Sequence, residues 1–292
     1  MPIQDPSTIG VVGAGQMGRG IAQVAAQSGF AVLLHDQDVK VLDLALRSID
    51  AGLKHQVEKG KLEESVRTQV IGRVRVAVEP EALSSADFTI EAISEDRALK
   101  TRVFAALDRI CRPDVILASN TSSLSITQIA ASTRRADRII GMHFMNPVPV
   151  MELVEIVAGQ STSRVTIETT QRLAKTFGKT PVAAQDYPGF ISNRILMPMI
   201  NEAIYALHEG VGSRDDIDTV MRLGMRHPMG PLALADFIGL DTCLAILQVL
   251  HEGFGDPKYR PCPLLRRMVD AGLLGKKSGR GFYQYGAGGI PT

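Results

Sequence analysis

Side chains of three different chemistries lie within one segment of the sequence, residues 119–156. A hydroxyl-rich loop at residues 119–123 follows an apolar run, His143 ends a second apolar run, and Glu155 lies inside a third. Open α/β sheets place their reactive groups at the ends of such short strand-like runs. The segment is therefore a candidate catalytic site.

Glu155 interrupts the apolar run LVEIV, where a buried carboxylate without a partner would be costly. His143 is the favoured partner, because a carboxylate on one ring nitrogen fixes the tautomer and stabilises the imidazolium once it takes a proton. Such a pair can remove the hydroxyl proton of an alcohol while hydride leaves the same carbon. The alternative is a hydrogen-bonded core histidine and a surface acid on an edge strand.

The hydroxyl loop offers a second group for the same chemistry. Ser122 or Ser123 could hydrogen-bond the reacting oxygen, but Ser and Thr clusters after strands are also common helix caps, and Ser125 begins a helical pattern. After His143, Pro147 and Pro149 stiffen the chain and are expected to hold it extended.

A hydride transfer needs an acceptor, and the N-terminus carries a dinucleotide pattern. In GAGQMG, Gly13 permits a tight turn, Gly15 lets the backbone approach a pyrophosphate, and Gly18 lets helix and strand pack closely. Residues 31–34 predict the next strand, followed by Asp36. A carboxylate there accepts hydrogen bonds from ribose hydroxyls and repels a 2′-phosphate, which favours NAD over NADP. The alternative is a structural glycine turn beside an ordinary surface acid.

Alternating helical and strand patterns surround these motifs. Helical periodicity covers residues 39–73 and 94–110. Strands are expected at residues 9–12, 31–34, 74–78, 88–93, 115–118, 139–144, 153–157 and 181–184. This order predicts an α/β fold with an N-terminal Rossmann-type NAD-binding domain at residues 1–187.

The pattern changes after the turn at residues 186–189, a natural domain boundary. Beyond it, helices are expected at residues 190–208, 214–223, 232–237, 242–251 and 263–271. The prediction is an all-helical domain at residues 188–292, with apolar faces available for substrate or for a homodimer. Residues 275–283 form a basic, glycine-rich loop or a flexible tail.

Composition excludes several classes of protein. With 292 residues and 45% hydrophobic content the chain can bury two cores, and Lys+Arg 32 against Asp+Glu 31 leaves no broad basic surface for nucleic acid or membranes. Three scattered cysteines fit neither a disulfide framework nor a metal site. Without a signal peptide or an apolar run of about 18 residues, the chain is expected to be soluble and cytoplasmic. An organelle enzyme cleaved of its transit peptide would look the same.

Seven motifs, spread in order over almost the whole chain, carry a family resemblance. They are VGAGQMGRGIAQ, IEAISED, SNTSSLSI, GMHFMNPVPVMELVEI, DYPGFISNRIL, HPMGPLALADFIGLD and GKKSGRGFYQY. Together they resemble the L-3-hydroxyacyl-CoA dehydrogenase family, in particular its short bacterial 3-hydroxybutyryl-CoA dehydrogenase form. The set is far more specific than a dinucleotide fingerprint by itself.

The resemblance implies reversible oxidation of a (3S)-3-hydroxyacyl-CoA to the 3-ketoacyl-CoA by NAD, as in fatty acid β-oxidation. It implies His143 as general base, Glu155 as its orienting partner, and Ser122 and Asn193 as donors to the C3 oxygen of the substrate.

The resemblance also implies residues that hold NAD or line the site: Glu95, Lys100, Asn120 and Asn146. Two positions depart from the family pattern. Met145 stands where Phe is common, and Glu152 where Lys is common, which leaves the preferred acyl chain open.

Two rival functions use the same motifs. One is a related hydroxy-acid dehydrogenase, like the L-gulonate 3-dehydrogenases and lambda-crystallins, which would ignore free CoA as a competitor. The other is a non-enzymatic NAD-binding protein, which would be expected to lack one member of the His143 and Glu155 pair.

Overall fold

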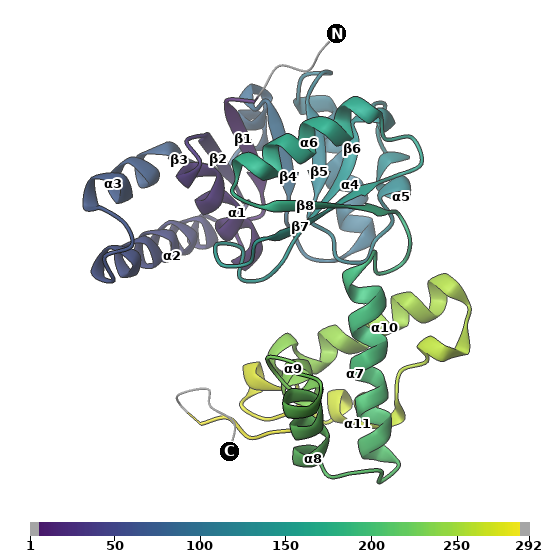
Figure 1. Ribbon diagram of the computed structural model, residues 1–292. Helices are drawn as coiled ribbons and strands as arrows, with labels where there is room; N and C mark the ends of the chain where they lie inside the picture. Colours follow the sequence, from purple (N-terminus) through teal and green to yellow (C-terminus); the bar gives the residue numbers. More distant parts are fainter. Residues whose placement is uncertain (1–5, 287–292) are drawn as a thin grey trace. The chain divides into compact units, whose positions relative to one another are not determined.

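The computed structural model describes residues 6–286 of the chain (Figure 1). The chain divides into two compact units, Met1–Tyr187 and Pro188–Thr292. Each unit has its own cluster of buried apolar side chains. The main sheet belongs to the first unit, and the second unit is built from helices.

Within residues 6–286, an eight-stranded sheet runs in the order β3-β2-β1-β4-β5-β6-β7-β8. The strands are β1 (Thr8–Val12), β2 (Ala31–His35), β3 (Val74–Ala77), β4 (Phe88–Glu91), β5 (Ile116–Ser119), β6 (Ile139–Phe144), β7 (Leu153–Ala158) and β8 (Thr180–Gln185). Strands β1 to β6 are parallel, β7 is antiparallel to β6, and β8 is parallel to β7. Every strand predicted from the sequence has a counterpart, and the predicted α/β class is confirmed.

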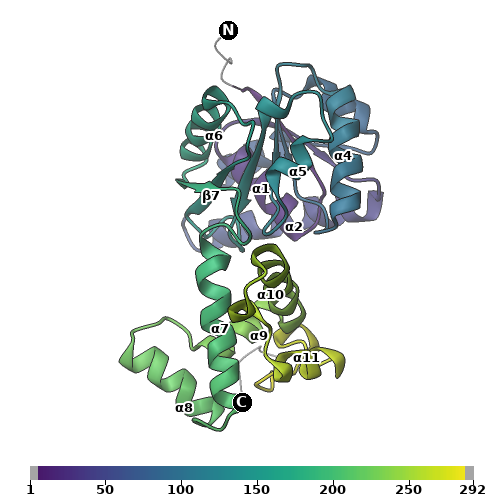
Figure 2. The same cartoon turned by 90° about the vertical axis from the view of Figure 1, so that its right-hand side faces the viewer.

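Helices cover both faces of this sheet; in Figure 2, α6 lies on one face and α4 on the other. The first unit contains α1 (Gln16–Gln27), α2 (Val39–Glu58), α3 (Glu64–Arg73), α4 (Arg97–Ile110), α5 (Ile126–Ala130) and α6 (Arg164–Thr176). The helical stretch expected from residue 39 is two helices, because Gly60 takes a left-handed conformation (φ +67°) just after α2. Helix α4 begins at Arg97 rather than at residue 94, because the Asp96 side chain accepts a hydrogen bond from the Leu99 N–H and caps it.

Helix α6 has no counterpart among the elements predicted from the sequence. Its buried face consists largely of Thr166, Thr169, Thr170 and Ala174, with Leu173 as the one large apolar side chain. Threonine hydroxyls on that face donate to backbone carbonyls: Thr170 Oγ1 to the Thr166 carbonyl, and Thr166 Oγ1 to the Asp137 carbonyl. The helical spacing is present, but α6 has few large apolar side chains, so it lacks the apolar residues by which the other helices were recognised in the sequence.

The second unit is helical, as predicted. Its helices are α7 (Ser192–His208), α8 (Arg214–Thr219), a π-helical turn at Val220–Gly224, α9 (Pro231–Ile238), α10 (Leu240–Phe254) and α11 (Pro263–Asp270). The basic loop near the C-terminus is packed rather than a flexible tail as far as residue 286. Its Phe282 and Tyr283 N–H groups donate to the buried Asp236 carboxylate, whose pKa is raised by burial, although these hydrogen bonds oppose the rise.

Residues 6–286 contain neither a single helix that could span a membrane nor a cluster of metal-binding side chains. No single helix in that range is long and apolar enough to cross a bilayer; α9 and α10 reach that length and composition only as a pair bent by 97°. The range contains no group of three His, Cys, Asp or Glu side chains that could hold a metal ion.

Candidate active site

His143 and Glu155 lie directly opposite each other on the antiparallel strands β6 and β7. Their side chains therefore project to the same side of the sheet, and His143 Nδ1 lies 2.8 Å from Glu155 Oε2. Both side chains are buried, at 8% and 1% exposure. Because β7 lies between β6 and β8, the alternative of a surface acid on an edge strand is wrong.

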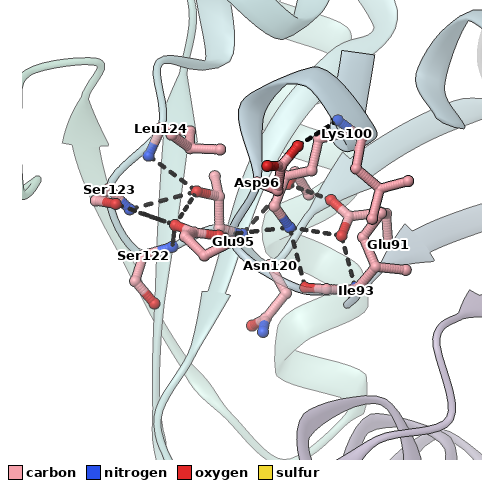
Figure 3. Close-up of polar contacts among 12 residues, drawn as sticks. Glu91, Ile93, Glu95, Asp96, Lys100, Asn120, Ser122, Ser123 and Leu124 are labelled. Atoms are coloured by element: carbon pink, nitrogen blue, oxygen red, sulfur yellow. Dashed lines mark hydrogen bonds and ion pairs between the residues drawn. The ribbon is translucent and has the colours of Figure 1, made fainter. Parts of the chain in front are cut away.

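The hydroxyl loop follows β5 and is held by Glu95 (Figure 3). Glu95 Oε1 accepts hydrogen bonds from the Ser122 N–H at 2.8 Å and from the Ser123 N–H at 3.0 Å. The Ser123 hydroxyl donates to the same oxygen, and Ser123 is buried, whereas Ser122 is half-buried. Ser125 caps α5 by accepting from the Gln128 N–H. The loop thus combines a helix cap with a serine that is more accessible than its neighbours.

Asn120 joins this loop to the strand that carries His143. Its side-chain oxygen accepts a hydrogen bond from the Phe144 N–H at 2.9 Å, and its own N–H donates to the Glu91 carbonyl at 2.7 Å. The carboxyl ends of β4, β5 and β6 are therefore linked by one amide side chain and its backbone.

The glycine-rich turn borders a cavity of about 350 Å³ at the carboxyl ends of β1, β2 and β4. Strand order reverses between β1 and β4, which is where open α/β sheets bind their ligands. Gly13 has φ +96°, which favours glycine. Gly15 lines the cavity, and a Cβ there would meet no atom within 4 Å. Open space beside the N-terminus of α1 fits a dinucleotide pyrophosphate.

Asp36 also lines this cavity. Its Oδ2 accepts a hydrogen bond from the Ala14 N–H at 2.9 Å, and its Oδ1 accepts from the Asp38 N–H. The Asp36 carboxylate is thus hydrogen-bonded to the backbone of the glycine-rich turn itself. This fixes a negative charge next to the place where a dinucleotide ribose would lie.

The other residues implied by the resemblance differ in burial, and one of them lies outside the first unit. Lys100 is 1% exposed, and its ammonium lies 2.6 Å from Glu91 Oε1 and 3.5 Å from Glu95 Oε2. Asn146 follows β6, and its side-chain oxygen accepts from Gln16 Nε2 at 3.0 Å. Asn193 belongs to the second unit, where it is a buried residue in the first turn of α7.

The chain between β6 and β7 turns back, so the expectation that Pro147 and Pro149 hold it extended is wrong. The N–H groups of Val150 and Met151 both donate to the Pro147 carbonyl, as the antiparallel return of β7 requires. Lys179 fastens this turn by donating to the carbonyls of residues 148 and 151. Burial lowers the pKa of Lys179, against the nearby Glu152 charge, which raises it.

Two polar residues of this region were not predicted from the sequence, Glu91 and Lys179. Glu91 ends β4, in the run FTIE, and is fully buried. The sequence carries a signal for Glu91, because this acid interrupts an apolar run in the same way as Glu155 does. Lys179 follows a glycine just before β8, and nothing in its sequence neighbourhood distinguishes it from a surface lysine.

Comparisons with known proteins agree with this architecture. Residues 8–187 match the family model "3-hydroxyacyl-CoA dehydrogenase, NAD binding domain", and residues 189–285 match "3-hydroxyacyl-CoA dehydrogenase, C-terminal domain". A probable 3-hydroxybutyryl-CoA dehydrogenase of Bacillus subtilis is 58% identical over 275 residues, covering 94% of this chain and 96% of that protein. The 3-hydroxybutyryl-CoA dehydrogenase of Bradyrhizobium diazoefficiens is 51% identical and covers 97% of each chain.

A solved structure has the same fold over nearly its full length. The crystal structure of (S)-3-hydroxybutyryl-CoA dehydrogenase from Ralstonia eutropha superposes with a TM-score of 0.94 at 48% identity, covering 96% of this chain and 99% of that one. The resemblance drawn from the seven motifs is confirmed, and the cofactor is NAD. This chain belongs to the 3-hydroxyacyl-CoA dehydrogenase family and is an NAD-dependent enzyme of that family.

Proposed function

We propose that this protein interconverts a short-chain (3S)-3-hydroxyacyl-CoA, such as 3-hydroxybutanoyl-CoA, and the corresponding 3-ketoacyl-CoA. The observation that carries the proposal is the buried hydrogen bond of 2.8 Å between His143 Nδ1 and Glu155 Oε2. The relatives reported above are named as 3-hydroxybutyryl-CoA dehydrogenases. Their names support a short acyl chain in the substrate. A role in fatty acid β-oxidation is part of the same proposal.

His143 acts as the general base in this proposal. With Nδ1 donating to Glu155, the other ring nitrogen, Nε2, takes the proton of the substrate C3 hydroxyl as the C3 hydrogen leaves with its electron pair. Bound NAD supplies the acceptor for that hydride. Glu155 stabilises the imidazolium that forms and keeps the ring in one tautomer and orientation. In the reverse direction, the imidazolium returns its proton to the carbonyl oxygen.

Ser122 and Asn193 are proposed as hydrogen-bond donors to the C3 oxygen. Ser122 is supported by its accessibility and by Glu95, which holds the loop through the Ser122 and Ser123 N–H groups. A donor aimed at the oxygen stabilises the charge that develops as the proton leaves. Asn193 would make its contribution from the helical unit.

The dinucleotide is proposed to lie along the cavity beside Gly13, Gly15 and Gly18. The remaining residues proposed to hold NAD or line its site are Asp36, Glu95, Lys100, Asn120 and Asn146. The N-terminus of α1 would meet the pyrophosphate, and Asp36 would accept from the adenosine ribose.

Asp36 leads to a prediction about cofactor choice. Because the Asp36 carboxylate accepts a hydrogen bond from the Ala14 N–H, the side chain cannot easily rotate away from a 2′-phosphate. We expect kcat/KM to be about 100-fold or more lower with NADP than with NAD, from like-charge repulsion near the ribose. In steady-state assays, Asp36→Ser should reduce the difference in kcat/KM between NAD and NADP. Equal activity of the wild type with both cofactors would contradict the role given to Asp36.

Steady-state kinetics test the function directly. NADH oxidation should be followed with a series of 3-ketoacyl-CoA substrates that starts with acetoacetyl-CoA, and free CoA should compete. Turnover of a free hydroxy acid such as L-gulonate, without competition by CoA, would favour the hydroxy-acid rival. NADH binding without turnover of any substrate in either series would favour a non-enzymatic protein.

We further propose that residues 1–187 bind the dinucleotide and that residues 188–292 form a substrate and dimerisation domain. In the helical unit, a largely apolar groove of about 490 Å³ is bordered by α7, α8 and the π-helical turn. Val211 and Val220 line it and are 76% and 57% exposed, and Leu223 nearby is 71% exposed. A second copy of the chain would cover this apolar surface.

Light scattering on a sizing column tests the proposed homodimer. The wild type should have the mass of a dimer, and Val220→Glu should shift it towards monomer, because a charge would be buried in the interface. Val165→Glu, at a 45% exposed position of α6, is the matched control and should remain dimeric. A monomeric wild type at micromolar concentration would contradict the proposal.

The location proposed is the cytoplasm. Cys111, Cys243 and Cys262 are all buried and free, which suits a reducing compartment. Burial raises the pKa of each thiol, that of Cys243 to about 12.

A further inference from the structure

A fully buried carboxylate, Glu91, directly precedes Ala92 and Ile93, which line the cavity beside the glycine-rich turn; Figure 3 draws its polar contacts. It is the last residue of β4, beside Val12 of β1 and Ser119 of β5 in the sheet. We propose that Glu91 is a positioning residue that sets the Lys100 ammonium and, through Glu95, the hydroxyl loop. The inference rests on the proposed function, in which Lys100, Glu95 and the loop serve the cofactor and the substrate.

Both carboxylate oxygens of Glu91 accept hydrogen bonds. Oε1 accepts from Lys100 Nζ at 2.6 Å and from the Ile93 N–H at 2.7 Å. Oε2 accepts from the Ser119 hydroxyl at 2.6 Å, and Ser119 Oγ in turn accepts from the Thr121 N–H. The side chain therefore joins helix α4, the turn after β4 and the first residues of the hydroxyl loop.

Lys100 contacts two carboxylates, one closer than the other. Its ammonium is close to Glu91, at 2.6 Å, and more distant from Glu95, at 3.5 Å. The Glu91 side chain is 0% exposed and that of Glu95 is 37% exposed. The contact between Lys100 and Glu91 is therefore both shorter and less screened by solvent. Glu91 thus determines where the charge of Lys100 is held.

The position of Lys100 determines what Glu95 can do. Because Lys100 is held by Glu91, Glu95 keeps Oε1 for the loop, where it accepts from the Ser122 and Ser123 N–H groups and from the Thr121 hydroxyl at 2.5 Å. If Lys100 closed on Glu95, the carboxylate would be drawn towards α4 and away from these donors. The loop that presents Ser122 would then lose its main acceptor.

Glu91→Gln isolates this role. Glutamine keeps the size of the side chain and one acceptor oxygen, but it removes the charge that holds Lys100. We expect Glu91→Gln to raise the Kd for NADH about tenfold and to lower kcat about tenfold, as for the loss of one charged hydrogen bond. NADH binding is read by fluorescence titration without acyl-CoA, at a temperature where circular dichroism shows a folded protein.

A double-mutant cycle tests whether Glu91 acts through Lys100. In a Lys100→Met background no ammonium remains to pull Glu95, so adding Glu91→Gln should change the NADH Kd by less than about twofold. The double variant should also be more stable than Lys100→Met, which leaves the Glu91 charge buried without its cation. This comparison remains informative if Glu91→Gln by itself fails to fold.

Asp108→Asn is the matched control on the same helix. Asp108 lies in the last turn of α4 and forms a buried ion pair with Arg135, with 2.8 Å between Arg135 Nε and Asp108 Oδ1. Its loss should lower the melting temperature but leave the NADH Kd unchanged. A stability loss in Glu91→Gln without a change in Kd or kcat would overturn the inference, as would additive effects in the cycle.

Failure of the inference about Glu91 can be distinguished from failure of the proposed function. If the wild type binds NADH but reduces no 3-ketoacyl-CoA, the proposed function fails, while the NADH titrations still decide whether Glu91 acts through Lys100. If the wild type is active and the cycle is additive, only the inference about Glu91 fails.

Discussion

His143→Ala is expected to lower kcat for acetoacetyl-CoA reduction by about 10²–10⁴-fold, because the variant lacks the acid that protonates the forming alkoxide. The same loss is expected in the oxidative direction, where the imidazole acts as base. NADH affinity, measured by fluorescence titration, should be unchanged, because His143 lies on β6 and does not line the cavity beside the glycine-rich turn. Near-normal turnover would refute the assignment.

Glu155→Gln provides the companion measurement. Glutamine can still accept from Nδ1–H of His143, but it cannot stabilise the imidazolium by charge, so kcat should fall while the hydrogen bond of 2.8 Å is largely kept. If His143→Ala and Glu155→Gln act on one step, the double variant should be little worse than His143→Ala. If the fold reductions in kcat of the two single variants multiply in the double variant, His143 and Glu155 have independent roles.

Gly15→Ala is expected to weaken NADH binding about 10- to 100-fold without lowering the melting temperature. Gly15 lines the cavity, and its added Cβ meets no protein atom within 4 Å. The methyl group would therefore disturb only a molecule that approaches the turn closely. Titration with NADH and thermal unfolding without cofactor separate the two effects.

Gly18→Ala should affect both binding and folding. A Cβ at Gly18 would lie 1.7 Å from the Gly13 carbonyl oxygen, so the turn must shift, at a cost of about 1–3 kcal/mol or more. Gly72→Ala is the control: it lies in α3, its Cβ meets nothing within 4 Å, and it does not line the cavity. It should leave NADH binding unchanged and stabilise α3 by up to about 1 kcal/mol. Unchanged NADH affinity in Gly15→Ala would contradict the proposed pyrophosphate position.

The first unit was largely predictable because its elements repeat a regular pattern. Short apolar runs after turn residues identified each strand, and Gly13, Gly15 and Gly18 marked where the first strand meets its helix. Prediction failed at α6, whose buried face is mostly threonine. It also failed at the turn after His143, where the antiparallel pairing of β7 reverses a chain that local proline stiffness favours as extended.

The sequence by itself determined the α/β class, the cofactor motif and the family, because these depend on residue types at short, regular spacings. It also singled out His143 and Glu155 as polar residues in apolar runs. Only the tertiary structure decided that these two are direct neighbours across β6 and β7 and that Glu91, Lys100 and Glu95 hold the hydroxyl loop. Strand register and side-chain contacts between distant segments depend on packing, and no local pattern encodes them.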